Sequence, residues 1–391
     1  MTQLDAVLAR MRARYDDVLG RYRTTMPELV AARTKSVGKF TRVCWTIAIP
    51  LFLRWKKLLG VEPLPAYVLQ NLRHPDIALN LDHDQVAIIG GFREFLDARR
   101  KGIRFVWGGY ITRAFELFYW ANEDQPLREV IEYLDCICPP GRRILFLWED
   151  SLPAGIVLSH FAVDSEGVTT VCVAHGYYGR SKVGIVPEGD CCDANFVWSE
   201  SQRKLFSKFG IRNCFVLGVP YDVRIPTPST DEVVLVGHCG RSSSNYEYFH
   251  TLAQFVKIFQ LLRGANIKVS YRPHPQDDME FVRSIFPKVP RTPKTELLRR
   301  SRGIYIGFSS SFLFECVNAG SLAIGLETAS LLEDRDFEVE VELDPDGYDE
   351  LPVLVKNLQE KLGQAPAMDP APLNSRLTSC IDRLEHALAM R

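Results

Sequence analysis

Two short stretches in the second half of the chain hold residue types that bind phosphate. The first is Tyr271-Arg272-Pro273-His274-Pro275, and the second is Gly307-Phe308-Ser309-Ser310-Ser311. Serine hydroxyls and free backbone N–H groups at the start of a helix form an anion pocket. A proline on each side of a histidine stiffens the backbone that aims its imidazole. These residues predict a phosphate site, although the serines alone are typical of a helix cap and a His-Pro pair alone is typical of a turn.

The elements around these stretches place both at one edge of a sheet. Each follows an apolar run that predicts a strand, Ile267–Tyr271 and Gly303–Phe308. A helical pattern, Ser311–Ala319, and a further strand, Leu322–Leu326, come next. Strands that alternate with helices predict a parallel sheet, whose ligands bind at the carboxyl ends of the strands. Glu315 would lie one turn into the helix, where a carboxylate can accept hydrogen bonds from ribose hydroxyls.

A third candidate loop, Gly237–Ser244, follows the predicted strand Val233–Val236. Its small residues would let the backbone approach a diphosphate, and an arginine adds positive charge. The predicted donor-binding set is therefore Gly240, Arg241, Arg272, His274, Pro275, Ser309, Ser310, Ser311 and Glu315.

Paired carboxylates in the first half are candidates for a general base. The predicted strand Ile144–Trp148 ends directly before Glu149, Asp150 and Ser151. A carboxylate just past a strand end can take a proton from a bound hydroxyl. Asp150 or Ser151 is equally typical of an N-cap for a helix that begins near Pro153, and the sequence leaves both interpretations open.

His175 is a further candidate base. It follows the predicted strand Thr169–Ala174, and Gly176 permits a tight turn that would present the imidazole. Histidine is the usual base at neutral pH, but a core or capping histidine is as common.

The overall composition limits the classes of protein to which the chain can belong. The chain has 391 residues, of which 46% are hydrophobic and 24% charged, with a net charge of −1. These values are ordinary for a soluble protein of two to three domains, and the charge argues against general nucleic-acid binding. The ten cysteines lack zinc-finger spacing and indicate reduced thiols in a cytosolic protein. The polar start of the chain does not resemble a cleavable signal peptide.

The pattern of elements predicts an α/β fold with two Rossmann-like domains that face a cleft, preceded by a helical extension. A proline-rich stretch separates the two domains. The predicted divisions are a basic helical segment, an acceptor domain, a linker, a nucleotide-donor domain and a tail helix, at residues 1–63, 64–220, 221–231, 232–363 and 364–391.

The segment Trp45–Leu59 within the extension holds a continuous apolar run, flanked by Lys39, Arg42, Arg54, Lys56 and Lys57. Its continuous apolar part is too short to span a bilayer. Two tryptophans with flanking lysines and arginines are typical of an interfacial anchor on an anionic membrane. An amphipathic helix packed on the body of the protein fits the same pattern.

These motifs resemble those of the GT-B glycosyltransferases of bacterial surface-polysaccharide synthesis, such as that of capsule or lipopolysaccharide. Within them the chain is most similar to the CMP-sugar group of sialyl-, polysialyl- and Kdo transferases. That group shares a paired carboxylate followed by glycine, a His-Pro, and a Ser-Ser or Ser-Thr. Here the corresponding residues are Glu149-Asp150, His274-Pro275 and Ser310-Ser311, in the same order, with Ser151 in place of the glycine. The resemblance covers roughly residues 64–330.

The resemblance implies the following roles. Glu149 or Asp150 would take the proton from the acceptor hydroxyl, and His274 would contact the phosphate of CMP and help the leaving group depart. Ser310 and Ser311 would bind the same phosphate. The donor would be a cytidine nucleotide sugar and the acceptor a glycan or a lipid-linked sugar, with no cofactor and no metal. Such an enzyme would be cytoplasmic, with peripheral contact to the inner face of the cell membrane.

A second group is also similar. Teichoic-acid polymerases that use CDP-glycerol carry a His-Pro, a Ser-Ser pair with an acidic residue shortly after it, and an earlier His-Gly, which His175-Gly176 matches. In that group the His-Gly histidine is the expected base. A GT-B nucleotide-sugar epimerase and a non-catalytic assembly scaffold remain as alternatives of other classes. A metal-dependent GT-A transferase is disfavoured, because Asp82-His83-Asp84 precedes its strand rather than following it.

Overall fold

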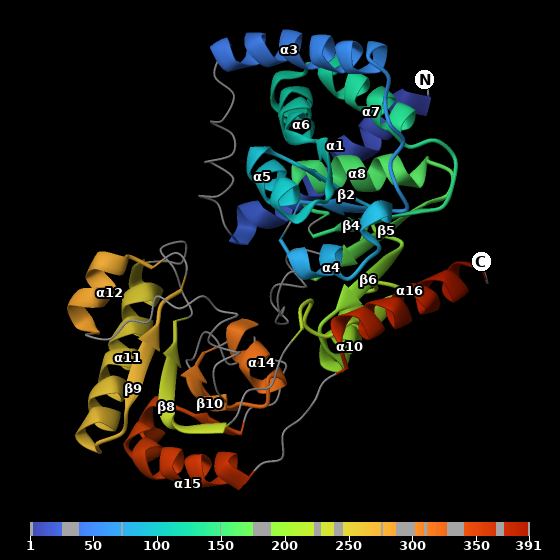
Figure 1. Ribbon diagram of the computed structural model, residues 1–391. Helices are drawn as coiled ribbons and strands as arrows, with labels where there is room; N and C mark the ends of the chain where they lie inside the picture. The colour runs from blue at the N-terminus through green and yellow to red at the C-terminus, as the bar shows by residue number, and fades with distance from the viewer. Residues whose placement is uncertain are drawn as a thin grey trace. The chain divides into compact units, whose positions relative to one another are not determined.

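A computed structural model describes most of the chain in two units (Figure 1). The described residues are 3–25, 39–71, 73–148, 150–174, 189–222, 228–237, 245–274, 277–286, 302–308, 311–326, 340–364 and 371–389. The first unit contains the described residues up to Ala174, those from 189 to 221 and those from 373 onward. The second unit contains those from 222 to 372.

Seven parallel strands form the sheet of the first unit. Their order is β3-β2-β1-β4-β5-β6-β7, and the strands are β1 (Tyr67–Gln70), β2 (Val86–Gly90), β3 (Arg104–Trp107), β4 (Arg143–Leu147), β5 (Val168–Val173), β6 (Ala194–Val197) and β7 (Cys214–Val216). The central strands are almost continuously apolar and buried, as expected for parallel strands covered on both faces. The order reverses between β1 and β4, which are direct neighbours.

Helices connect these strands and cover the sheet. They are α4 (Pro75–Leu79), α5 (Phe92–Lys101), α6 (Gly109–Ala121), α7 (Gln125–Ile137), α8 (Pro153–Val163) and α10 (Glu200–Lys208), with a short 3₁₀ turn η1 (His83–Gln85). Local signals set their ends. The Glu94 carboxylate accepts the backbone N–H of Gly91 at 2.8 Å at the start of α5, and Gly102 ends that helix with a φ of 67°.

The second unit has a parallel sheet of five strands in the order β12-β11-β10-β8-β9. The strands are β8 (Pro228–Val236), β9 (Val269–Arg272), β10 (Arg302–Gly307), β11 (Leu322–Leu326) and β12 (Val341–Leu343). The helices are α11 (Asn245–Gly264), α12 (Met279–Ile285), α14 (Ser311–Asn318), α15 (Leu351–Gln364) and the 3₁₀ turn η2 (Pro345–Glu350). Apolar residues of α11, α15 and the central strands form one core.

Helices from both ends of the chain belong to the first unit. Helix α1 (Gln3–Thr25) buries Met11 and Tyr15, α3 (Lys39–Leu58) buries Leu53, and α16 (Leu373–Ala389) buries Leu377. From α16, the Arg376 guanidinium also donates to the backbone carbonyls of residues 217, 219 and 221. The two terminal stretches that the sequence sets apart as an extension and a tail therefore complete the core of the first unit. No described helix is long and apolar enough to cross a membrane.

The role of α16 in the core predicts a stability effect. Leu377 is 1% exposed, and we expect Leu377→Ala to destabilise the first unit by about 2–5 kcal/mol, because it removes buried methyl groups and leaves a cavity. Leu58, 86% exposed on α3, is the matched control. Leu58→Ala should change stability by no more than about 0.5 kcal/mol. Urea unfolding of both variants tests this, and equal effects would contradict the packing of α16.

Candidate functional site

The topology of the second sheet selects the edge at which a ligand binds. Strand β8 pairs with β9 on one side and with β10 on the other, so the strand order reverses there. In open parallel sheets, ligands bind beyond the carboxyl ends of the strands at this reversal. The segments after β8 and β10, which begin at Gly237 and Phe308, flank this point. The predicted glycine and serine loops lie at these two positions in the sequence.

Arg272 and the start of α14 bring positive charge to this edge. The guanidinium carbon of Arg272, at the end of β9, lies 3.8 Å from the ring centroid of Phe312. Phe312 is the second residue of α14, which begins at Ser311. The cation–π contact holds the arginine beside the helix N-terminus, where the backbone N–H groups of the first turn carry partial positive charge. Both features favour an anionic ligand.

A buried carboxylate holds the loop that carries His274. Oδ2 of Asp277 accepts the backbone N–H of His274 at 2.7 Å and the Tyr271 hydroxyl at 3.3 Å. Asp277 is only 8% exposed, and burial raises its pKa to about 6, although the bonds from His274 and Tyr271 act to lower it. Asp277 therefore positions His274. Asp277 was not singled out from the sequence, although aspartate side chains commonly accept hydrogen bonds from nearby backbone N–H groups.

Only glycine fits at the end of β8. The backbone N–H of Gly237 donates to the Arg272 carbonyl at 2.8 Å. A Cβ at this position would lie 2.7 Å from the Tyr271 hydroxyl and 2.8 Å from the backbone nitrogen of His274. The end of β8 can therefore approach the segment from Tyr271 to His274 this closely only because glycine has no side chain.

The other predicted donor residues divide into two sets. Glu315 is fully buried on α14, one turn after Ser311. Its role toward a ribose stays a prediction. The remaining predicted residues lie outside the described part of the chain, namely Gly240, Arg241, Pro275, Ser309 and Ser310.

The first sheet has its own reversal, between β1 and β4, and two aromatic rings meet there. The His74 ring, at the start of α4, lies 4.9 Å from the ring of Trp148, which follows β4. His74 was not singled out from the sequence, although His74-Pro75 repeats the His-Pro pattern of the second unit. Glu149 directly follows Trp148 and therefore adjoins this edge in sequence, and it lies outside the described residues together with His175.

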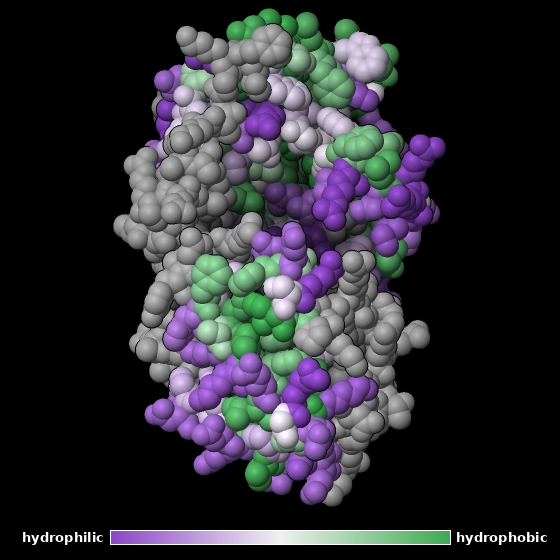
Figure 2. All heavy atoms as spheres, turned by 90° about the vertical axis from the view of Figure 1, so that its left-hand side faces the viewer, coloured by the Kyte–Doolittle hydropathy of each residue, from purple (hydrophilic) through white to green (hydrophobic). Residues whose placement is uncertain are grey.

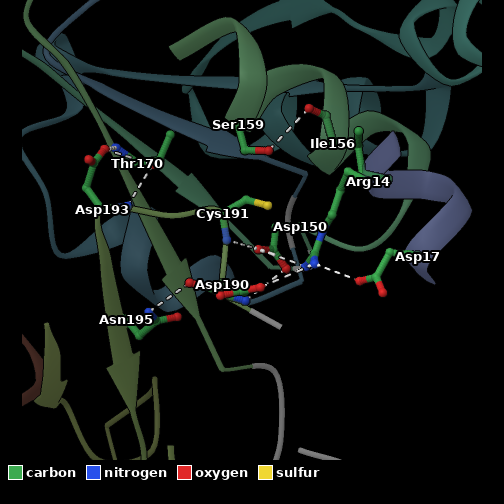
Figure 3. A network of polar contacts seen from close by, with 11 residues as sticks. Arg14, Asp17, Asp150, Ile156, Ser159, Thr170, Asp190, Cys191, Asp193 and Asn195 are labelled. Atoms are coloured by element: carbon green, nitrogen blue, oxygen red, sulfur yellow. Dashed lines mark hydrogen bonds and ion pairs between the residues drawn. The ribbon is translucent and has the colours of Figure 1, made fainter. Parts of the chain in front are cut away.

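The Asp150 carboxylate accepts hydrogen bonds from the backbone of the segment before β6 (Figure 3). Its Oδ1 accepts the N–H of Gly189 at 2.8 Å, and its Oδ2 accepts the N–H of Cys191 at 3.0 Å. Oδ2 also lies 4.0 Å from Nη2 of Arg14 on α1. The side chain is fully buried. These contacts favour a structural role, while the catalytic role remains an untested prediction.

The interpretation of this stretch as a helix cap is wrong. Helix α8 begins at Pro153, and its N-cap residue is Leu152, with no side-chain hydrogen bond. The carboxylate of Asp150 instead bonds two N–H groups far along the chain. Burial and the nearby Asp150 carboxylate also raise the pKa of Cys191 to about 12, which disfavours the reactive thiolate form at neutral pH.

Comparison with solved structures shows the GT-B fold. A protein of Listeria monocytogenes described as a UDP-N-acetylglucosamine 2-epimerase matches 84% of this chain and 98% of its own, with 12% identity and a TM-score of 0.52. The UDP-GlcNAc 2-epimerase of Methanocaldococcus jannaschii matches 81% and 99%, with 13% identity and a TM-score of 0.47. The calicheamicin glycosyltransferase CalG4 matches 83% and 98%, with 11% identity and a TM-score of 0.41. No protein-family model and no curated protein sequence matches the chain.

The pKa of Asp277 predicts a pH dependence. Because its pKa is raised from 3.8 to about 6 in the folded state, its contribution to stability is fully present below the unfolded pKa and is lost as pH rises through about 6. Asp277→Asn stays neutral and keeps an oxygen to accept the His274 N–H. We expect the melting temperature of the native protein, minus that of the variant, to fall from pH 4 to pH 7. A difference that is constant with pH would contradict this.

Proposed function

We propose that the protein is a metal-independent glycosyltransferase that moves a sugar from a CMP-activated donor to a hydroxyl group of a glycan or glycolipid. The sugar would be of the sialic acid or Kdo type, and the product would belong to a surface polysaccharide. The GT-B fold supports a nucleotide-sugar enzyme in general. The finer assignment rests on the motifs of the sequence.

The observation that carries the proposal is the grouping of Arg272, His274 and the N-terminus of α14 at the reversal point of the second sheet. A phosphate bound there would meet the Arg272 guanidinium and the N–H groups at the start of α14. His274, held by Asp277, would contact the same phosphate and protonate it as the sugar leaves. Such stabilisation acts on charge that develops in the transition state, which is where it accelerates the reaction.

The acceptor would bind at the carboxyl edge of the first sheet. A sugar hydroxyl is a poor nucleophile and needs a positioned base. Glu149 is the base in this proposal, because it follows Trp148, the residue after β4, in the sequence and matches the first carboxylate of the sialyltransferase motif. Asp150 already accepts two backbone hydrogen bonds, so it is the weaker candidate.

Nucleotide binding and His274 provide the first test. CMP should raise the melting temperature of the protein, because a ligand that binds only the native state stabilises it, whereas UDP and GDP should not. His274→Ala should lower transfer by about 10²-fold or more if the imidazole supplies acid catalysis. Because the side chain is only half-buried, folding should be retained, and far-UV circular dichroism is the control. Stabilisation by UDP alone would exclude the CMP-sugar group.

Three conservative variants identify the base. Glu149→Gln, Asp150→Asn and His175→Asn each remove basicity and keep the side-chain shape. We expect Glu149→Gln to lower turnover at saturating substrates by about 10²–10⁴-fold, and Asp150→Asn to lower stability rather than turnover. A loss confined to His175→Asn would contradict the choice of Glu149 and would favour transfer of a polyol phosphate from CDP-glycerol.

The alternatives of other classes give different results in the same assays. A nucleotide-sugar epimerase would convert UDP-GlcNAc without any acceptor. A non-catalytic assembly scaffold would bind nucleotides weakly or not at all.

The proposal also includes a peripheral location on the inner face of the cell membrane, because the acceptor in surface-polysaccharide synthesis is expected to be lipid-linked.

A further inference from the structure

The solvent side of α3 is almost entirely apolar. On an α-helix, residues three and four apart share one face, and such a row of α3 and the turn after it is exposed. Its members are Val43, Ile47, Leu51, Trp55, Leu58 and Leu59, which are 59%, 57%, 61%, 54%, 86% and 63% exposed. Figure 2 shows hydrophobic atoms along the top of the molecule, where Figure 1 places α3. A surface helix of a soluble protein would carry polar residues on this side.

The opposite side of α3 is fixed to the first unit. Ile49 and Leu53 are buried in its core. At the border of the helix, the Arg54 guanidinium donates to the Glu129 carboxylate on α7, and Lys57 pairs with Glu129 and Glu132 on the same helix. Helix α3 is therefore attached to the first unit by its other side, and its apolar row faces outward.

The charge of α3 is entirely positive. The helix contains no acidic residue and five basic ones, Lys39, Arg42, Arg54, Lys56 and Lys57. Of these, Lys56 has no carboxylate partner among the described residues, and its Nζ lies 5.8 Å from the ring centroids of Phe52 and Trp55. An apolar row that includes a tryptophan and has a positive border matches the interface of an anionic bilayer.

A pocket of about 240 Å³ opens beside the C-terminal end of α3, next to the edge strand β3. Lys56 and Arg104 bring positive charge to it, and Glu62 pairs with Arg104 at 3.3 Å. Its aromatic lining comes from Phe52, Phe105, Trp107 and Tyr133. Trp107 is 39% exposed. Cationic groups set among aromatic rings, at the border of an apolar surface, suit the phosphate of a lipid headgroup.

We infer that the exposed row of α3 lies in the interface of an anionic bilayer, with a lipid phosphate in the pocket lined by Lys56 and Arg104. The helix would lie parallel to the membrane, with Leu51 and Leu58 among the acyl chains. This surface would bring the enzyme of the proposed function to its lipid-linked acceptor. Only the biological role of this membrane binding rests on the proposed function, because the binding surface itself does not depend on any transfer reaction.

A second copy of this chain is a poorer occupant of the same surface. Helix α3 has no acidic residue of its own to offer a second copy. Arg42, Arg54 and Lys57 already pair with carboxylates of the first unit, and Lys56 would meet only like charge, which is repulsive at an interface. The apolar row is also a single convex helix face rather than a groove. A bilayer rich in acidic headgroups satisfies both the charge and the apolar surface.

Sedimentation with vesicles tests the inference on the full chain without nucleotide. The protein should bind vesicles of phosphatidylcholine and phosphatidylglycerol at low salt, and bind phosphatidylcholine vesicles weakly. Leu51→Asp should lower the partition coefficient about tenfold or more, since it replaces an apolar contact with a charge. Lys56→Gln should lower it about fivefold, the effect of one basic residue near an anionic surface. The control is Val353→Asp on α15, because Val353 is 65% exposed, similar to Leu51.

The outcomes are separable from those of the proposed function. Because Leu51 is exposed, its variant should keep the melting temperature and the CMP-induced shift of the native protein. Absence of vesicle binding at low salt, or equal binding by Leu51→Asp, would overturn the inference and leave the nucleotide result untouched. A concentration-dependent dimer that Leu51→Asp abolishes, with no vesicle binding, would assign the surface to a second copy and overturn it as well.

Discussion

Parallel strand pairing is the constraint on which both units depend. Every strand pair in the two described sheets is parallel. Parallel neighbours cannot be joined by tight turns, so a crossover lies between them and the carboxyl ends of all strands reach one edge. Residues distant in sequence, such as Arg272 and Phe312, meet there for this reason alone. The position of each candidate site is thus a consequence of strand direction.

Buried carboxylates fix the loops at these edges. Asp150 accepts two backbone N–H groups in the first unit and Asp277 accepts one in the second. A buried charge is costly unless it is hydrogen-bonded, and here its partners are backbone groups that a loop would otherwise leave unpaired. Each aspartate therefore loses its hydration on folding, and its hydrogen bonds hold a loop beside the candidate site in place. A carboxylate that is a candidate catalytic group in the sequence can therefore have the structural role of holding a loop.

The strands and helices with strong local signals could be predicted from the sequence. The continuous apolar runs at β2, β4, β10 and β11 indicate buried parallel strands, and the structure has all four. Strand β1 has only four residues and gave no usable signal. Packing of α16 on the first unit, and the bonds of Asp150 to residues 189 and 191, depend on contacts between distant parts of the chain. Asp277, by contrast, bonds a backbone N–H group only three residues away, a local contact that aspartate side chains commonly make.

The packing of α16 has a consequence for how the chain acquires its structure during synthesis. The first unit is discontinuous in sequence, since its last helix follows the entire second unit. The ribosome therefore finishes residues 222–372 before it makes the helix that covers Leu217 and Phe215. Until then, this apolar surface of the first unit has no cover, and nascent chains with exposed apolar surface are prone to aggregate. The described part of the second unit is continuous in sequence, so the unit whose synthesis begins first is completed last.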